Sequence, residues 1–248
     1  MAQRVPELQK LLLGNSYPGR GICVGMSPDG QHVMSAYFIM GRSENSRNRV
    51  FYQQGQHVVK TRAYDESRMV DPSLIIYAPV RRLRLDPTSV DLIVTNGDQT
   101  DTIRDALVNG GTFEGALRTR TFEPDPPNYT PRISALCRIR DGKAAFQMGI
   151  LKSDRGNPEV TLRQFFEWDG MAKGEGVFLH TYVGDGNPLP SFEGEPEKVK
   201  VGEDLKTWTN EIWESLDRDN KISLFTCAVS LKDGTWQTLI VNRHEMQG

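Results

Sequence analysis

Several classes of protein are excluded by what this chain of 248 residues lacks or has little of. It contains three cysteines and four histidines, and no stretch approaches the roughly 18 apolar residues that a membrane-spanning helix needs. Thirty basic and thirty-two acidic residues give a net charge of -2, so no general basic field attracts nucleic acid. We therefore expect neither a membrane nor a nucleic-acid partner, and any anion site must be local.

The few cysteines and histidines lack the spacing of a metal site. Cys23, Cys137 and Cys227 are far apart and each lies in an apolar run, which is typical of buried thiols rather than of a disulfide framework or a zinc site. The histidines show no ligand spacing with one another or with the cysteines. The first residues, MAQRVPELQKLLLG, hold too short an apolar run for a signal peptide. We therefore predict a cytoplasmic protein without a metal.

Two signatures of nucleotide-binding folds are also missing. The chain has no G-x-G-x-x-G that opens a helix and no G-x-x-x-x-G-K-[ST]. Strands and helices do not alternate along its whole length. Rossmann and phosphate-loop folds are therefore disfavoured.

Short β-rich runs dominate residues 21–183. They are ICVGM, HVMSAYFIM, RVFYQ, SLIIYAPV, VDLIVT, ISALCRI, AAFQMGIL, VTLRQFF and VFLHTYV. Turn residues separate these runs, and the Asp-Gly pairs at 141–142 and 233–234 are typical of tight turns between antiparallel strands. We predict a mainly antiparallel sheet, with surface loops at 153–158 and 184–198.

Helical periodicity occurs at residues 6–13, 100–108 and 203–216. The last segment has an apolar stripe made of Leu205, Trp208, Ile212 and Leu216. Its three- to four-residue spacing predicts burial against a sheet. Strands with helices on their outer faces indicate an α+β protein, and we expect a single domain over residues 1–248.

Two basic segments are candidate anion sites. Residues 41–49, GRSENSRNR, connect two predicted strands, and their three arginines and several hydroxyl or amide donors can cradle a phosphate. A solvated hairpin loop explains the same composition equally well. Upstream, Arg20 stands between two glycines, which permit close approach of the backbone to a ligand. A plain turn with a surface arginine is the alternative.

Two further segments place polar groups on restrained backbone. Residues 96–101, NGDQTD, lie where a strand ends and a helix begins, so backbone N–H groups there can bind a ligand. Asp98 or Thr100 can equally cap that helix. Residues 123–132, EPDPPNYTPR, are stiffened by four prolines, and a rigid loop can hold polar groups around a substrate. An ordinary proline-rich surface loop has the same composition.

In their order along the chain, these segments resemble the archaeal-type IMP cyclohydrolase family. The matching pieces are Tyr17-Pro18-Gly19-Arg20-Gly21, Ala36-Tyr37, Arg42-Ser43 with Asn48-Arg49, Asp71-Pro72 through Tyr77, Thr95-Asn96-Gly97, Asp101-Thr102-Ile103 and Thr130-Pro131-Arg132-Ile133. The resemblance implies a four-layer α-β-β-α sandwich of mainly antiparallel sheets, similar to the N-terminal-nucleophile hydrolases. It also implies an enzyme without cofactor that closes the formylated aminoimidazole-carboxamide ribonucleotide to IMP, with loss of water. Because the chain begins Met1-Ala2, we do not expect a terminal nucleophile.

The resemblance further implies a role for each polar segment. The residues assigned to substrate binding are Arg20, Ser43, Asn48, Arg49, Asn96, Gly97, Asp98 and Arg132, and those assigned to the chemistry are Arg42, Tyr77, Glu123 and Asp125. Among them, Arg20, Arg42 and Arg49 are expected to hold the phosphate. Tyr77 is expected to transfer a proton or polarise the oxyanion, while either Glu123 or Asp125 moves a proton. Asn96 and Arg132 are expected to hold the base and the carboxamide.

Other functions stay open at the level of sequence. A different amidohydrolase on the same scaffold can act on a nucleotide-like substrate, because fold does not fix reaction. A non-catalytic nucleotide-binding module needs the arginines but neither Tyr77 nor the 123–132 loop. RNA binding fits least, because no strand carries an aromatic and basic stripe. Among oligomeric states, a homo-oligomer is the expectation.

Overall fold

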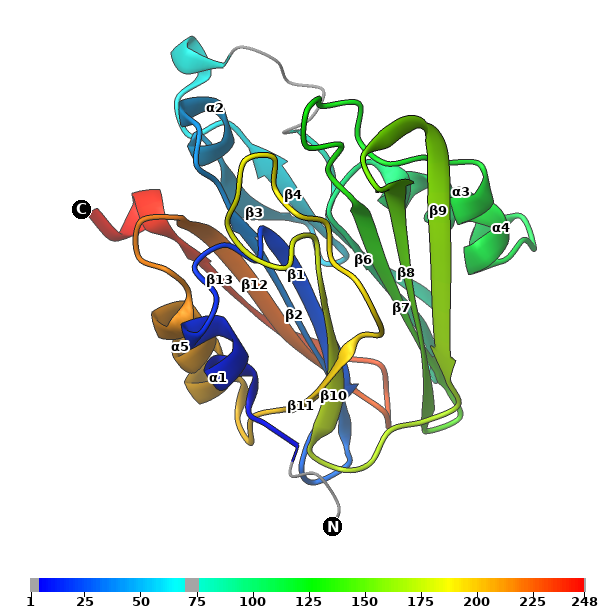
Figure 1. Cartoon of the computed structure of the whole chain (residues 1–248). Coiled ribbons are helices and arrows are strands. Elements are labelled where there is room, and N and C mark those ends of the chain that lie inside the picture. The colour runs from blue at the N-terminus through cyan, green and yellow to red at the C-terminus, as the bar shows by residue number, and fades with distance from the viewer. Residues whose placement is uncertain (1–4, 70–75, 248) are drawn as a thin grey trace.

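The computed structural model describes residues 5–69 and 76–247. Its strands form two sheets in which every pairing of neighbouring strands is antiparallel. The prediction of a mainly antiparallel α+β protein is confirmed. Figure 1 shows the two sheets side by side, with helices at the left and right of the pair.

The first sheet has six strands in the order β11-β10-β1-β2-β12-β13. They are β1 (Arg20–Met26), β2 (His32–Met40), β10 (Glu175–His180), β11 (Glu197–Lys200), β12 (Lys221–Ser230) and β13 (Trp236–Asn242). The second sheet has seven strands in the order β3-β4-β5-β6-β7-β8-β9. They are β3 (Val50–Gln54), β4 (Val58–Arg62), β5 (Val80–Asp86), β6 (Ser89–Thr95), β7 (Arg132–Arg140), β8 (Lys143–Asp154) and β9 (Asn157–Trp168). The described helices are α1 (Leu8–Leu13), α2 (Glu44–Arg47), α3 (Gln99–Val108), α4 (Phe113–Arg118), α5 (Leu205–Ser215), η1 (Glu66–Arg68) and η2 (Arg243–Gln247).

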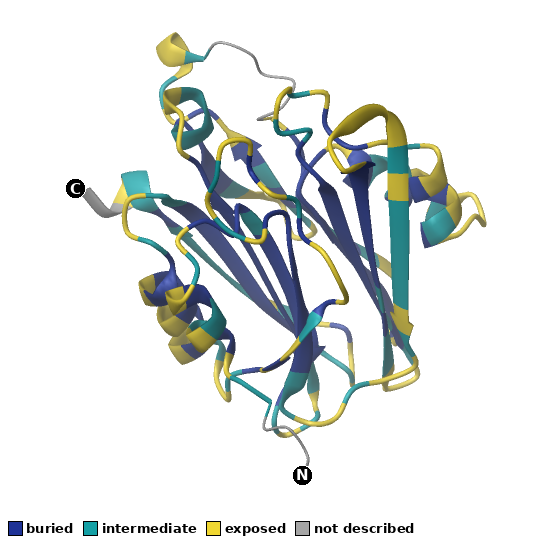
Figure 2. Ribbon diagram, viewed as in Figure 1, coloured by how far each residue is buried: buried dark blue, intermediate teal, exposed yellow. Residues whose placement is uncertain are grey.

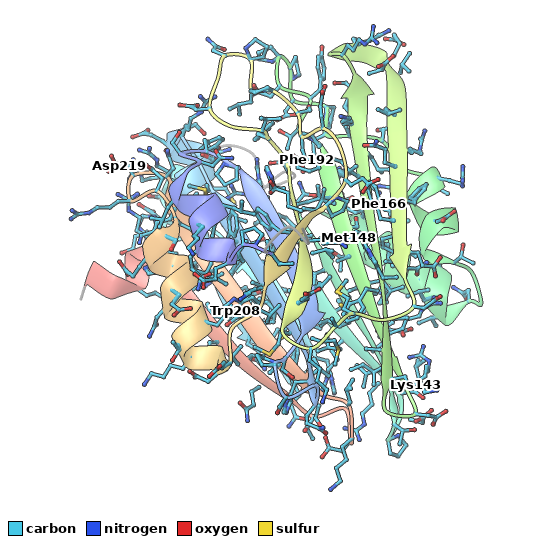
Figure 3. All side chains as sticks on the ribbon, turned by 60° about the horizontal axis from the view of Figure 1, so that its bottom comes forward. Lys143, Met148, Phe166, Phe192, Trp208 and Asp219 are labelled. Atoms are coloured by element: carbon cyan, nitrogen blue, oxygen red, sulfur yellow. The ribbon has the colours of Figure 1, made fainter. Side chains whose placement is uncertain are left out.

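Three apolar clusters hold these elements together. The largest lies between the sheets and includes Ile22 and Tyr37 from the first sheet and Val94 and Phe146 from the second. Met148 on β8, Phe166 on β9 and Phe192 on the loop after β10 meet in the same core (Figure 3). Alternation along each strand sends one set of side chains into this core and the other set to the outer face.

The outer faces of both sheets are covered by helices (Figure 2). On the first sheet, Leu8 and Leu12 of α1 and Trp208 and Ile212 of α5 pack against side chains such as Phe38. Asp204 caps α5 by accepting hydrogen bonds from two backbone N–H groups in its first turn. On the second sheet, a smaller cluster joins α3 and α4 to β6, β7 and β8. The expected apolar stripe of the 203–216 helix is therefore confirmed as core.

Several local predictions are confirmed. The Asp-Gly pair at 141–142 turns between β7 and β8, where both residues have positive φ. The pair at 233–234 lies between β12 and β13. Predicted helices 6–13 and 100–108 correspond to α1 and α3. The three cysteines are buried free thiols.

Other local predictions are wrong. Segment 153–158 is not a loop, because most of it belongs to β8 and β9, which turn tightly at Arg155 and Gly156 with positive φ. The predicted strand SLIIYAPV is not one in its described part, since β5 begins only at Val80. Its residues 73–75 lie outside the described residues, as does most of the Asp71–Tyr77 match. Among the described residues, no helix is long and apolar enough to cross a membrane.

Candidate active site

Polar side chains gather where one end of the inter-sheet core meets the connecting loops. β1, β7 and the segment before β5 begin at this end, while β6 and β10 finish there, at the top of Figure 1. The antiparallel order of both sheets therefore brings together residues that lie far apart in the sequence. Arg20 lies at the centre of this cluster. Its pKa is affected by four neighbouring side chains, which are Tyr17, Tyr77, Glu123 and Tyr182.

Arg20 begins β1 on the face that continues through Ile22 into the inter-sheet core. Burial lowers the pKa of its guanidinium, but Glu123 and the three tyrosines together outweigh burial, so the pKa lies above its usual value. Its Nε has no hydrogen-bond partner among the described residues. Arg20 is therefore a partly buried cation whose Nε donor is left without a partner in the described part of the protein.

The glycine before Arg20 has a structural reason that the sequence did not reveal. Gly19 has a φ of +78°, and a Cβ there would collide with Thr181 Oγ1 and the Tyr182 ring. The backbone N–H of Arg20 donates to the same Thr181 hydroxyl at 3.1 Å. Gly19 thus lets the backbone pack closely against Thr181 and Tyr182, which follow β10, and this contact fixes the position of Arg20 at the site.

Arg49 is the most buried cation of the site, with 1% of its surface exposed. Its Nε donates to Ser46 O at 2.9 Å, whereas both terminal nitrogens lack a partner among the described residues. Burial and the nearby Arg20 guanidinium both lower its pKa. A buried, unpaired guanidinium is costly in free energy, so its free donors indicate a binding site for an anion or a carbonyl oxygen.

Tyr77 lies beside these arginines and is 7% exposed. Its hydroxyl forms a hydrogen bond of 2.8 Å with the hydroxyl of Tyr37 on β2. Burial raises the pKa of Tyr77, while Arg49 and Arg20 oppose that rise. Its backbone is held by Thr61, whose Oγ1 accepts from Tyr77 N–H at 2.9 Å. Tyr77 is therefore a protonated hydroxyl in a fixed position next to two cations.

Glu123 supplies a buried carboxyl group to the same cluster. It is 3% exposed, and burial raises its pKa even though Arg20 and Arg132 oppose that rise. Its neighbour Asp125 has another role: one carboxylate oxygen accepts from Thr130 N–H at 2.6 Å and the other from the Thr130 hydroxyl. Thr130 Oγ1 in turn contacts Tyr182 Oη at 2.6 Å. Asp125 holds the proline-rich loop together, which leaves Glu123 as the carboxyl facing the arginines.

Arg132 approaches Glu123 from the start of β7. Its Nη1 donates to Asp98 at 2.8 Å and to Gln99 Oε1 at 2.7 Å, which fixes the guanidinium at the N-terminus of α3. Burial opposes ionisation of Asp98, but Arg120 and Arg132 outweigh it and lower the Asp98 pKa. Asp98 occupies the N-cap position without making a side-chain cap bond, so it orients Arg132 and Arg120 instead.

The Asn96 side chain uses its hydrogen-bonding groups within the protein and holds β6, β7 and α3 together. Its Nδ2 donates to Pro131 O at 2.8 Å, and its Oδ1 accepts from Ile133 N–H at 2.9 Å and from Gln99 at 3.0 Å. The side chain is 1% exposed. Asn96 therefore joins the end of β6 to the start of β7.

Gly97 is where a side chain would disturb the site most directly. A Cβ there would collide with Arg132 Nη1 and lie 2.6 Å from Gln99 Oε1 and 3.4 Å from Glu123 Oε1. We expect Gly97→Ala to lower kcat/KM about tenfold or more, because displacing the guanidinium by a fraction of an ångström spoils its aim. Gly170→Ala is the matched control, because its Cβ would meet only Ala144 O, at 3.9 Å. Equal kcat/KM for the two variants would contradict this role.

The remaining candidates of the 41–49 segment lie outside the buried cluster. Ser43 and Ser46 form a capping box around α2. Asn48 exchanges two hydrogen bonds of 2.8 Å with the backbone of Asp65. Arg42 pairs with Asp185, donates to Gly186 O at 2.9 Å and stacks over the Tyr17 ring at 5.0 Å. Of its three arginines, only Arg49 is buried.

A family comparison agrees with this geometry. The model described as "IMP cyclohydrolase-like protein" matches residues 17–234, which include every candidate residue of the buried cluster. The chain belongs to the IMP cyclohydrolase-like family. No match was found among curated proteins or among solved structures.

The sequence alone assigned no role to two residues that contact the candidate site, Tyr37 and Gln99. Tyr37 lies inside the apolar run HVMSAYFIM, where a tyrosine is read as core. Gln99 belongs to the polar segment 96–101, but only the fold shows that its amide oxygen accepts a hydrogen bond from the Arg132 guanidinium. Among the described residues, no group of three or more histidines, cysteines or acids is placed to hold a metal ion.

Proposed function

We propose that this member of the IMP cyclohydrolase-like family is an IMP cyclohydrolase. It would close the formylated aminoimidazole-carboxamide ribonucleotide to IMP, with loss of one water and without a cofactor. The observation that supports the proposal best is the cluster of the partly buried Arg20 with the buried Arg49, Tyr77 and Glu123, in which, among the described residues, both guanidiniums keep free donors beside a tyrosine hydroxyl and a carboxyl group. Ring closure needs these three kinds of group: donors for a developing oxyanion, an acid and a base.

In the first step, the carboxamide nitrogen attacks the formyl carbon of the folded substrate. The Glu123 carboxylate takes a proton from that nitrogen, and the Tyr77 hydroxyl gives its proton to the formyl oxygen. The result is a cyclic carbinolamine, a neutral Glu123 and a Tyr77 phenolate. Arg20 and Arg49, which already act on the pKa of Tyr77, stabilise this negative charge.

In the second step, the carbinolamine loses water. The Glu123 carboxyl returns its proton to the hydroxyl group, which leaves as water, and the Tyr77 phenolate takes the proton of the former formamide nitrogen. A carbon–nitrogen double bond forms in the new ring. Both residues end in the protonation states in which they began, so no further acid, base or oxidant is required.

The other candidates take supporting places in this proposal. Arg20 and Arg49 lie with Tyr77 and Glu123, so we assign them to the reacting end of the substrate rather than to its phosphate. Arg42, at the exposed rim, keeps the assignment to the phosphate, with Ser43 and Asn48 shaping its segment through α2. Arg132, oriented by Asp98 and next to Gly97, would hold the carboxamide. Asn96 and Asp125 would act by fixing the backbone around them.

We also infer the four-layer α-β-β-α arrangement of the N-terminal-nucleophile hydrolases for this chain. Support comes from the helices that pack on the outer face of each sheet and from the apolar core between the sheets. A cytoplasmic location is supported by three buried free thiols, which suit a reducing compartment. A homo-oligomer is supported by the 12-residue strand β9, which among the described residues pairs with β8 alone and so offers a free edge to a second copy.

A product analysis separates this proposal from its competitors. The full chain is incubated with the formylated ribonucleotide, and both IMP and formate are quantified. A cyclohydrolase yields IMP without formate, whereas an amidohydrolase acting on the formamide releases formate and no IMP. IMP binding without either product would indicate a non-catalytic module and overturn the proposal.

The pH dependence of the reaction follows from Glu123. Its carboxylate form accepts the first proton, so kcat/KM should fall as the pH drops through the pKa of Glu123. Burial raises that pKa above its ordinary value of 4.5, so the acid limb should lie above pH 4.5. Glu123→Gln should lower kcat about 10²-fold or more and abolish this limb, because the amide cannot accept the proton. An unchanged acid limb in the variant would contradict the role of Glu123.

A further inference from the structure

Tyr37 is fully buried on β2 and faces the core between the two sheets. Its ring packs against Phe51 of β3 with 5.5 Å between ring centroids. Its neighbours across the strands are Ile22 on β1 and Phe225 on β12. Among the described residues, its hydroxyl has one hydrogen-bond partner, the Tyr77 hydroxyl at 2.8 Å. A polar atom so deep in an apolar core costs free energy unless it is bonded.

Two hydroxyl groups can share one hydrogen bond in either direction. If Tyr77 donates to Tyr37, its proton points away from the substrate. If Tyr37 donates to Tyr77, the Tyr77 proton is free to point outward. Tyr37 is the more buried of the two residues, at 0% exposure against 7%, so we expect the substrate to reach Tyr77 and not Tyr37.

The charged groups around the pair favour the second direction. Arg49, which precedes β3, and Arg20, which begins β1, lower the pKa of both tyrosines, and after burial they are the largest influences on Tyr77. Glu123, on the proline-rich loop, opposes them at Tyr77 to a smaller extent. Burial raises the pKa of Tyr37 well above its usual value, and the bond to Tyr77 raises it further. The same bond lowers the pKa of Tyr77. Negative charge therefore gathers on Tyr77, while Tyr37 keeps its proton and donates it.

We infer that Tyr37 is a positioning residue that donates its hydroxyl hydrogen to Tyr77, aims the Tyr77 proton at the substrate and stabilises the Tyr77 oxygen once that proton has gone. Its catalytic consequence rests on the proposed function of Tyr77. Tyr37 itself touches no reacting atom. Its contribution lies in the hydrogen bond, which strengthens when its acceptor becomes charged.

The first test follows the ionisation of Tyr77 in the free protein, without any substrate. The seven tyrosines are labelled with carbon-13 at the ring carbon that bears the hydroxyl, and Tyr77→Phe assigns the Tyr77 signal by its loss. In Tyr37→Phe, the titration midpoint of Tyr77 should move to higher pH by about one unit, because its phenolate loses a donor. A midpoint that stays in place or moves to lower pH would show that Tyr37 is not the donor.

The second test measures the reaction. Tyr37→Phe should lower kcat about tenfold and leave KM within about twofold, since the substrate does not contact Tyr37. Thr226→Val is the matched control. It also removes one hydroxyl of a buried hydrogen-bonded pair, here the pair of Thr226 and Thr209, but on the outer face of the same sheet. The control should change neither kcat nor the Tyr77 midpoint. If the wild-type chain forms no IMP, the proposed function fails, and the titration still decides whether Tyr37 donates to Tyr77.

Discussion

Tyr77→Phe should lower kcat by about 10²- to 10⁴-fold, the range by which a positioned acid or base accelerates a reaction. The substitution removes only the hydroxyl that we propose as the proton donor to the formyl oxygen, so KM should stay within about threefold of the wild-type value. Steady-state kinetics of IMP formation measure both constants. The ring of Tyr77 remains to fill its place, so the variant should still fold, with a loss of stability of about 1–3 kcal/mol because the buried Tyr37 hydroxyl loses its partner.

The control for this variant is Tyr52→Phe on β3. Tyr52 is partly exposed, and the Arg62 guanidinium lies over its ring, 5.8 Å from the ring centroid. Its strand β3 pairs with β4, which carries Thr61, the residue that bonds to the backbone of Tyr77. Its kcat should equal that of the wild type. A kcat for Tyr77→Phe within about threefold of the wild type would mean that the hydroxyl takes no part in the chemistry.

Arg49→Met should have opposite effects on activity and on stability. Loss of the guanidinium removes the donors that we assign to the reacting end of the substrate, so kcat/KM should fall about 10²-fold or more. The same change removes a buried cation whose terminal nitrogens have no protein partner among the described residues. Replacing such a charge by an apolar side chain of similar volume should stabilise the free protein by about 1–4 kcal/mol.

Thermal unfolding of the free protein measures the second effect. For a chain of this size, about 1 kcal/mol corresponds to about 2–4 °C, so Tm should rise by several degrees in Arg49→Met. Arg62→Met, at an exposed position of β4, should leave both Tm and kcat/KM near the wild-type values. A lower Tm for Arg49→Met would show that Arg49 is satisfied within the protein and is not held for a ligand.

Much of the fold was predictable because its strands and turns carry their patterns locally. HVMSAYFIM, VDLIVT and ISALCRI became β2, β6 and β7, and Asp-Gly turns lie where expected. Strands β4 and β5 were not predicted, because VVKTR and VRRLRLD are rich in charge. In β4, Val59 is buried while Arg62 reaches solvent. In β5, the basic residue Arg82 is itself buried two residues after Val80, which no pattern of alternating polarity predicts.

The site was predictable only through the resemblance, because its members are separated by long stretches of chain. Arg20, Tyr77 and Glu123 meet through the strand order of two sheets, which no local pattern encodes. Local reasoning also could not separate Arg49 from Arg42. They lie in one segment on either side of the short helix α2, yet Arg49 is buried and Arg42 is exposed at the rim. The prediction that Asp98 or Thr100 caps α3 missed the fact that Asp98 instead orients Arg132.

The most direct test of the central claim is the appearance of IMP from the formylated ribonucleotide. The purified chain is mixed with this substrate, and the ultraviolet change of ring closure is followed while chromatography identifies the product. Our account predicts IMP at a rate proportional to protein concentration, with Tyr77→Phe reduced at least 10²-fold. No IMP at any concentration of a folded wild-type chain would contradict the account.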